Sequence, residues 1–161
     1  MSEEIFGAVQ KLPVNGTKKQ VVLQCAPLLT GIKLSNLLNV RSDQKEEVLR
    51  IFEGSPVCCR VLYEFQGRLS ILLYRPGMLA AYLEREDVKK LMTSFGYENP
   101  DLEETLNRIA DAYQDHMNGK RGFPHEIGLV LGYPPVDVEG FIEKEGRDFL
   151  YSGYWQVYGN L

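Results

Sequence analysis

The clearest pattern in the chain is a pair of β-rich runs separated by two turn residues. In residues 57–65 successive side chains alternate between an apolar set and a more polar set, as in a strand with one buried face. Gln66-Gly67 interrupts the alternation, and residues 68–74 form a second β-rich run. This pattern predicts a β-hairpin over residues 57–74.

Two further segments are predicted as strands. Residues 20–25 form a short apolar run with β-branched residues at its start, although its length alone does not separate a strand from the start of a buried helix. Residues 153–158 form an aromatic-rich run near the end of the chain. We therefore expect a small sheet built from strands at residues 20–25, 57–65, 68–74 and 153–158.

Apolar positions at spacings of three or four predict helices elsewhere in the chain. The best specified helix follows Asn99, a capping residue, and carries one apolar stripe as far as Met117. Gly96 is expected to end the preceding helix in the left-handed conformation. The other helical patterns cover residues 28–38, 42–52, 76–95 (with a break near 85–87) and 136–142.

Composition supports one folded domain. The chain has 161 residues, 44% of them hydrophobic, and a formal net charge of -4. A chain of this size buries enough surface for a hydrophobic core, and its apolar content is too high for a disordered protein. With no repeat and no linker in the sequence, we predict a single α+β domain over residues 1–161, in which 1–19 are a polar N-terminal segment and a small sheet with a central β-hairpin packs against several helices.

The sequence predicts a cytoplasmic protein with free thiols. It has no apolar run near the roughly 18 residues that cross a bilayer, and its acidic start, Met1–Glu4, is unlike a signal peptide. Its three cysteines contain no CxxC pair. We therefore expect no membrane partner and no disulfide framework.

Glycine, proline and polar residues are concentrated between Phe123 and Ile142, in the segment FPHEIGLVLGYPPVDVEGFI. This segment resembles the signature FPHEIG-x-x-LGYP-x-x-DV-x-GFI of an uncharacterised, mainly clostridial family of bacterial domains. Residues 25–38, 72–76 and 95–97 and the closing aromatic run also match that family. The resemblance implies no particular activity.

This chain departs from the family pattern at two places. Family members commonly have a histidine just before the Cys-Ala-Pro sequence, whereas this chain has Gln24. Many members also continue into another helix after the closing strand, whereas this sequence stops at Leu161. A chemistry that needs the additional histidine is therefore not expected here.

Cys25 is the candidate nucleophile. It comes directly before Ala26-Pro27 and a predicted helix start, where free amides and the helix dipole favour a thiolate. His125 as general base, with Glu126 or Asp137 as its orienting group, would complete a Cys-His arrangement. The alternative is that Cys25 is a small buried apolar residue.

His125-Glu126 is the most prominent polar pair, and the sequence predicts no metal site there. Position 129 is Leu129, so the zinc-binding HExxH pattern is absent, and adjacent side chains on a helix diverge. The only other histidine is His116, at the edge of an amphipathic helix. Alternatively, Glu126 lies in the first turn of a short helix and complements its dipole.

The spacing of apolar residues and glycines in 126–138 also fits a helix-turn-helix, but its charge does not. Residues 137–148 contain five acidic and only two basic side chains. Because binding to DNA depends largely on Lys and Arg that neutralise phosphates, we predict no nucleic-acid partner.

Three other side chains are candidate ligand contacts. Tyr133 and Trp155, with neighbouring tyrosines, can line a pocket for a flat ligand, although such aromatic residues are usually part of a core. Arg75 precedes Pro76-Gly77 and can reach an anion at a helix start, or simply lie on the surface. The sequence identifies no cofactor.

We therefore expect a module that binds a small molecule or another protein and uses residues 123–142 as its recognition surface. The alternative is a small thiol-dependent enzyme that uses Cys25 with His125. The sequence leaves open whether the protein is an enzyme.

Overall fold

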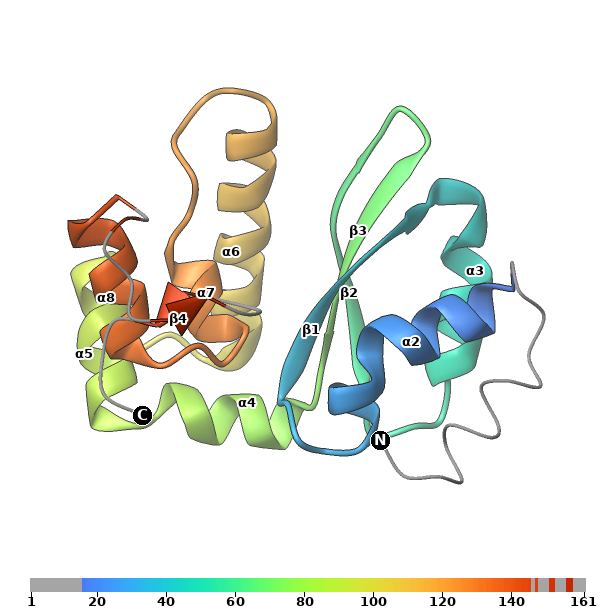
Figure 1. The fold of residues 1–161 in the computed structure, drawn as a ribbon, viewed down its shortest axis with the longest axis horizontal. Helices are drawn as coiled ribbons and strands as arrows, with labels where there is room; N and C mark the ends of the chain where they lie inside the picture. Colours follow the sequence, from blue (N-terminus) through green and yellow to red (C-terminus); the bar gives the residue numbers. More distant parts are fainter. Residues whose placement is uncertain (1–15, 146, 148–150, 153–155, 158–161) are drawn as a thin grey trace. The chain divides into compact units, whose positions relative to one another are not determined.

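A computed structural model describes residues 16–145, 147, 151–152 and 156–157 of the chain (Figure 1). The chain divides into two compact units, Met1–Met78 and Leu79–Leu161. The described elements comprise helices and a small antiparallel sheet, so the predicted α+β class is confirmed. The single domain over residues 1–161 stays a prediction.

The first unit contains a three-stranded antiparallel sheet. Its strands are β1 (Ser35–Arg41), β2 (Cys58–Phe65) and β3 (Arg68–Tyr74), in the order β1-β3-β2. The predicted hairpin is therefore confirmed as β2 and β3, with β3 in the centre of the sheet. Gln66 and Gly67 both have positive φ, 49° and 76°, as the tight turn between two twisted strands requires.

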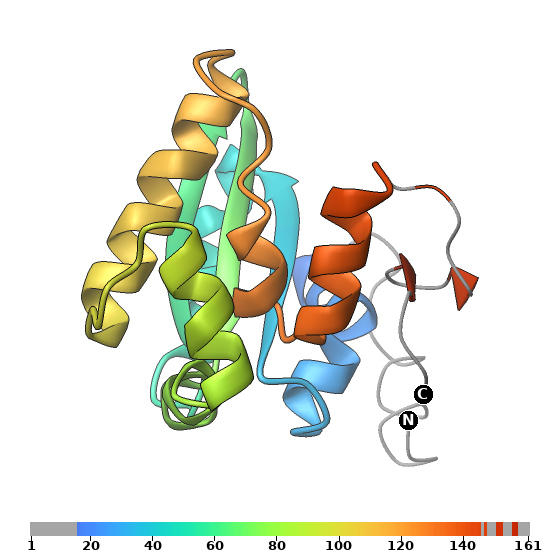
Figure 2. The ribbon, with the colours of Figure 1, turned by 90° about the vertical axis from the view of Figure 1, so that its left-hand side faces the viewer.

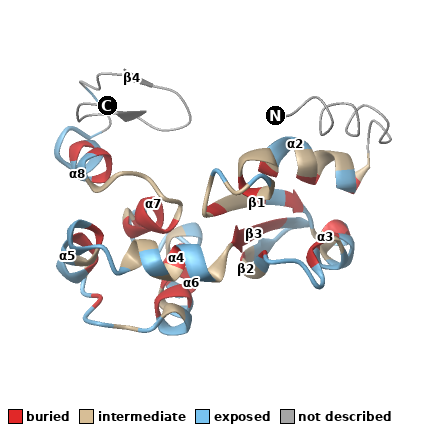
Figure 3. Ribbon diagram, turned by 90° about the horizontal axis from the view of Figure 1, so that it is seen from below, coloured by how far each residue is buried: buried red, intermediate tan, exposed pale blue. Residues whose placement is uncertain are grey.

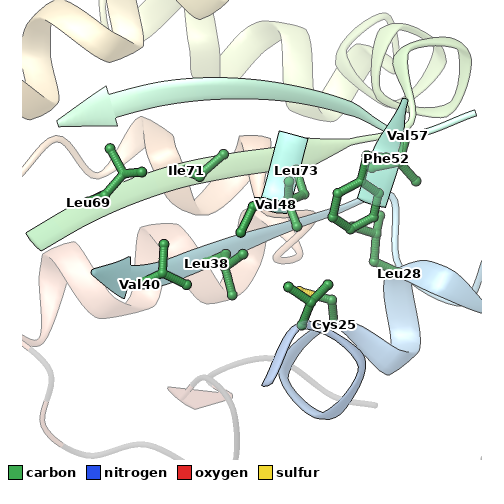
Figure 4. Packing of buried hydrophobic residues seen from close by; sticks show 11 residues of the cluster. Cys25, Leu28, Leu38, Val40, Val48, Phe52, Val57, Leu69, Ile71 and Leu73 are labelled. Carbon is green, nitrogen blue, oxygen red and sulfur yellow. The ribbon is translucent and has the colours of Figure 1, made fainter. Parts of the chain in front are cut away.

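Helices α2 (Thr17–Leu29) and α3 (Lys45–Phe52) pack against one face of this sheet. A short 3-10 helix, η1 (Ser42–Gln44), leads into α3. Figure 4 shows the core between the helices and the strands. The buried residues of this core are Val21, Cys25, Leu28, Leu38, Val40, Val48, Phe52, Val57, Leu69, Ile71 and Leu73.

The strand predicted at residues 20–25 is wrong, because this segment lies within the helix α2. The four residues that α2 buries recur at spacings of three or four, so the apolar run supplies one face of a helix. Pro27 lies inside the helix, near its end.

The helix predicted at residues 28–38 is also wrong. Helix α2 ends at Leu29, and β1 begins only six residues later, at Ser35. Leu38 and Val40 of β1 are buried, whereas the intervening Asn39 is exposed. β1 pairs with β3 over its whole length. The N–H and C=O groups along one edge of β1 therefore form hydrogen bonds with a neighbouring strand, whereas a helix would have paired them within the segment.

The second unit is mainly helical. Helix α4 (Pro76–Leu83) is followed by α5 (Glu86–Ser94). Gly96, just after the end of α5, has the positive φ expected there. Helix α6 (Leu102–Met117) is capped by Asp101, whose side chain accepts a hydrogen bond from the Glu104 amide, and not by Asn99 as predicted.

The region with the family-like motif forms two short helices, α7 (Glu126–Val130) and α8 (Pro135–Glu143). Helix α7 packs against both α5 and α8 (Figure 2), and its five residues are all buried (Figure 3). Gly132 ends the α7 segment with a positive φ of 82°. No helix in the described part of the chain is both long and apolar enough to cross a membrane.

The predicted closing strand is only partly described. Strand β5 (Gln156–Val157) falls within it and pairs with β4 (Tyr151–Ser152). Residues 153–155 and 158, and with them the candidate ligand contact Trp155, lie outside the described residues.

Candidate functional site

The start of α7 separates the side chains of the His125-Glu126 pair. His125 is the N-cap residue and Glu126 is the first helical residue. The two consecutive side chains diverge, as adjacent positions at a helix start do. The ring of His125 contacts other rings, whereas the carboxylate of Glu126 reaches a buried tyrosine. The polar pair seen in the sequence therefore belongs to two different environments.

On the His125 side, four rings form a continuous series, which we call the ring cluster: His116, Phe123, His125 and Phe141. The ring centroids are 5.4 Å apart for His116–Phe123, 5.6 Å for Phe123–His125 and 5.8 Å for His125–Phe141. The first two pairs meet edge to face, a favourable arrangement for aromatic rings. Phe123 and Phe141 are 46% and 40% exposed, so the cluster opens to solvent.

His125 is half-buried, and its surroundings disfavour the imidazolium form. Burial lowers the pKa of His125 below its ordinary value of 6.5, and the charge of Arg121 acts in the same direction. The charge of Glu126 raises this pKa and so opposes them in part. The imidazole is therefore neutral at neutral pH and packs as an aromatic ring.

We expect the folded protein to lose stability on acidification because of His125. Its pKa is lower when folded than when unfolded, so as the pH falls through 6.5 the unfolded chain takes up a proton before the folded one does. In an NMR titration the His125 ring should have a midpoint below 6.5, and Glu126→Gln should lower it further. A midpoint at or above 6.5 would contradict the burial of the ring.

On the other side, Glu126 is a buried carboxylate, only 3% exposed. Its Oε1 accepts a hydrogen bond of 3.2 Å from the Tyr97 hydroxyl, and Nη2 of Arg121 lies 3.8 Å from the same oxygen. Burial raises the pKa of Tyr97, and the nearby Glu126 charge adds to that effect. The phenol therefore remains protonated and acts as the donor.

The Glu126 carboxylate lies at the edge of a groove of about 310 Å³ within the second unit. Helix α6 contributes Arg108, and the loop before it contributes Tyr97. The Arg108 guanidinium lies over the Tyr97 ring, 4.0 Å from its centroid, and donates to the Gly96 carbonyl oxygen. We call this the Glu126 groove; its lining residues are Phe95, Tyr97, Arg108, Asp111, Ala112, Asp115, Arg121 and Glu126.

A close approach at Gly128 holds α7 against α8. A Cβ atom at Gly128 would meet Cγ2 of Val138 at 3.2 Å and Cδ2 of Tyr133 at 3.4 Å. Tyr133, a predicted ligand contact, is half-buried against this glycine, and its carbonyl oxygen accepts a 2.8 Å hydrogen bond from the Tyr82 hydroxyl. Both the ring cluster and the Glu126 groove are therefore attached to a closely packed helix.

Cys25 lies in the core of the first unit, whereas His125 belongs to the second. The thiol is fully buried, and Nδ2 of Asn36 lies 3.4 Å from its sulfur. Burial raises the pKa of Cys25 to about 11. A protonated thiol without access to solvent is a poor nucleophile, so this environment favours the apolar alternative.

The thiols should therefore differ strongly in reactivity. Cys58 is exposed, whereas burial raises the pKa of Cys25 and of Cys59 to about 11, leaving each about a hundredfold less thiolate than an ordinary thiol of pKa 9.0. With Ellman's reagent at pH 8, we expect one fast-reacting thiol in the native protein and none in Cys58→Ser. A fast-reacting thiol in Cys58→Ser would contradict the burial of Cys25 and Cys59.

The Arg75 side chain binds the C-terminal end of helix α2. Its Nε donates to the Leu28 carbonyl oxygen and its Nη2 to the Leu29 carbonyl oxygen, both at 3.1 Å. These carbonyls belong to the last turn of α2, where the helix itself supplies no donor, and the Leu28 oxygen also accepts from the Gly31 amide. The guanidinium predicted to bind an anion at a helix start is thus bound to the end of a different helix.

Within the described residues, no group of three or more His, Cys, Asp or Glu side chains is close enough together to hold a metal ion. His116 is near Phe123 and the Arg121 carbonyl, with Nδ1 of the imidazole 3.3 Å from that oxygen.

Comparison with known proteins places the chain in a family. The sequence profile of DUF3793, described as a protein of unknown function, matches residues 21–161. The chain belongs to the DUF3793 family. This confirms the resemblance to an uncharacterised domain family. No curated protein and no solved structure matches this DUF3793 chain.

The sequence indicated only part of the DUF3793 site. Tyr97 lies in the short 95–97 match, but it is 29 residues before Glu126. Arg121 lies in a basic loop five residues before Glu126, and nothing in that loop signals a contact with the carboxylate. Arg108, Asp111 and Asp115 are three and four residues apart, so the sequence places them on one face of α6. That shared face was the one feature of the sequence that indicated part of the groove.

Proposed function

We propose that this DUF3793 protein is a binding module that recognises another protein through the ring cluster. The observation that carries the proposal is that Phe123 and Phe141, on either side of the half-buried His125, are both substantially exposed. Leaving two phenylalanine rings in water is unfavourable unless a partner covers them, and grouped exposed apolar side chains are typical of interaction sites.

The order of the rings supports a specific surface. Each phenylalanine contacts the His125 ring, so both are held in place before a partner binds. Aromatic side chains that are fixed in advance lose little conformational freedom on binding, and they often provide most of the binding energy. The partner should therefore present aliphatic or aromatic side chains to the two phenylalanines.

The ring cluster is carried by helices that pack against one another. His125 caps α7, which is buried between α5 and α8, and Phe141 extends from α8. The contact at Gly128 couples these two helices. A surface built on packed helices keeps its geometry better than one built on a loop.

Photo-crosslinking tests this proposal. We would replace Phe123 with p-benzoylphenylalanine in the full chain and irradiate it in a lysate of the source cells. Phe65, which is 56% exposed on β2, would carry the same probe as the matched control. We expect discrete cross-linked adducts from position 123 that are missing from position 65.

A second substitution makes the test specific to the cluster. Phe141→Ser removes the other exposed ring while leaving the probe in place, and it should strongly reduce the adducts formed at position 123. Identical adducts at positions 123 and 65, adducts insensitive to Phe141→Ser, or no adduct at position 123 would each contradict the proposal.

A further inference from the structure

We infer that the Glu126 groove binds an organic cation, a guanidinium or primary ammonium group, on the carboxylate of Glu126. The ligand would donate hydrogen bonds to the carboxylate while its alkyl part lies in the groove. This site uses the Glu126 side chain, whereas the ring cluster uses the His125 side chain. It does not depend on the proposed function.

The first argument is that the Glu126 carboxylate receives fewer hydrogen bonds than it can accept. A carboxylate can accept about four hydrogen bonds, and burying one without partners is costly. Among the described residues only Tyr97 and Arg121 reach it, and both approach Oε1. Oε2 has no hydrogen-bond partner in this part of the chain.

The second argument is that the oxygen without a partner is not sealed from solvent. Within the described residues, Ser42 Oγ is the only sealed side-chain oxygen or nitrogen without a hydrogen-bond partner. Oε2 of Glu126 also has no partner, so it cannot be sealed. Glu126 lines the groove, so we take the groove as the route by which a ligand would reach that oxygen. A ligand can therefore reach the carboxylate without any rearrangement of the backbone.

The third argument is the charge around the opening. Asp111 and Asp115, four residues apart on α6, line the groove together with Glu126. One positive group on the same helix, Arg108, is already bound to the Gly96 carbonyl oxygen and stacked on Tyr97. These three carboxylates do not form a metal-binding group, which favours a larger cation with several N–H donors.

Arg121 already presents such a cation to the site. It lies five residues before Glu126, is 44% exposed and approaches Oε1 at 3.8 Å, which is beyond hydrogen-bonding distance. Because its guanidinium is exposed and forms no hydrogen bond to the carboxylate, this pair is weaker than a hydrogen-bonded one. A ligand guanidinium that forms short hydrogen bonds to both oxygens would displace Arg121 at low cost.

Titration of the full chain with n-propylguanidinium chloride, followed by amide NMR, tests the inference. We expect saturable shifts at Tyr97, Arg121 and Glu126, with a dissociation constant on the order of 1 mM for so small a probe. Tetramethylammonium chloride has the same charge but no N–H donor, so it should produce no saturable shift.

Two variants should change the affinity for n-propylguanidinium in opposite directions. Glu126→Gln should weaken binding by at least about tenfold, the loss expected for charge-assisted hydrogen bonds, whereas Arg121→Gln should tighten it by about threefold. Glu143→Gln removes an equal charge from the exposed surface of α8 and should leave binding unchanged. The amide spectrum of each variant reports whether it is folded.

The peptide acetyl-Gly-Arg-Gly-amide separates the two sources of such a cation. Tighter binding of the peptide than of n-propylguanidinium indicates an arginine side chain of a protein, and weaker binding indicates a free small molecule; both outcomes support the site. The inference is overturned if n-propylguanidinium does not saturate, if tetramethylammonium binds equally well, if Glu143→Gln weakens binding as much as Glu126→Gln, or if Arg121→Gln also weakens it.

Discussion

Leu73→Ala is expected to lower the free energy of unfolding of the first unit by about 2–5 kcal/mol, the range for a leucine removed from a well-packed core. Leu73 is fully buried on β3, the central strand of the sheet, and faces the core against α2 and α3 (Figure 4). The cavity cannot close easily, because strands hold the backbone on both sides of β3. Urea unfolding of the full chain, followed by the amide signals of β1, β2 and β3, measures this loss.

Leu23→Ala is the matched control for Leu73→Ala. Leu23 is a leucine of the same unit, but it is 55% exposed on α2. Its truncation should change the free energy of unfolding by no more than about 0.5 kcal/mol. Equal losses in the two variants would mean that Leu73 does not lie in a tight core.

Gly128→Val should destabilise the second unit by about 2 kcal/mol. Already the first added carbon would meet Val138 at 3.2 Å and Tyr133 at 3.4 Å, and the branched methyl groups of valine have no room beyond it. Helices α7 and α8 would have to move apart. We expect a lower urea midpoint for the amide signals of these two helices and a change in the signals of His125 and Phe141.

Two substitutions separate this steric effect from a general effect of valine. Gly122→Val adds the same side chain at an exposed loop glycine with nothing within 4 Å, so it should leave stability almost unchanged. Gly128→Ala should have a much smaller effect than Gly128→Val, because a small movement of Val138 relieves the contact and alanine favours a helix. A neutral Gly128→Val would rule out close packing there.

The two proposed sites lie next to each other in the sequence at the start of α7. His125 and Glu126 are adjacent in sequence, yet one belongs to an exposed series of rings and the other to a buried hydrogen bond with Tyr97. A change on one side is thus transmitted through a single turn of helix. The pKa of His125 depends on the charge of Glu126, so binding of a cation in the Glu126 groove should lower that pKa.

Local sequence patterns were sufficient to predict the hairpin and several of the helices. Two β-rich runs on either side of Gln66 and Gly67 were enough to indicate the hairpin of β2 and β3. The alternation predicted along β2 does not hold, because the pairing register shifts between Val61 and Tyr63, so that Leu62 is buried and Phe65 is exposed. The long apolar stripe of α6 is confirmed. At its start, however, Asn99 and Asp101 were both capable of capping, and the structure uses Asp101.

Residues 20–41 were mispredicted because their local signals conflict. The β-branched residues after Gln20 favour a strand, but the segment becomes a helix because Val21, Cys25 and Leu28 fill one core. β1 becomes a strand because β3 pairs with it along its whole length. Arg75 then stabilises the end of α2 from a position 46 or more residues later, which no local pattern predicts.

For the candidate site, local sequence was enough to indicate that residues 123–142 combine polar, glycine and proline positions, and it offered the first turn of a short helix as one place for Glu126. Only the packed chain decided which partners those side chains meet. Tyr97 approaches Glu126 from 29 residues away, and Phe141 approaches His125 from the next helix. The free energy of such contacts comes from burial and from matched hydrogen bonds between distant segments, and neither exists until the helices have come together.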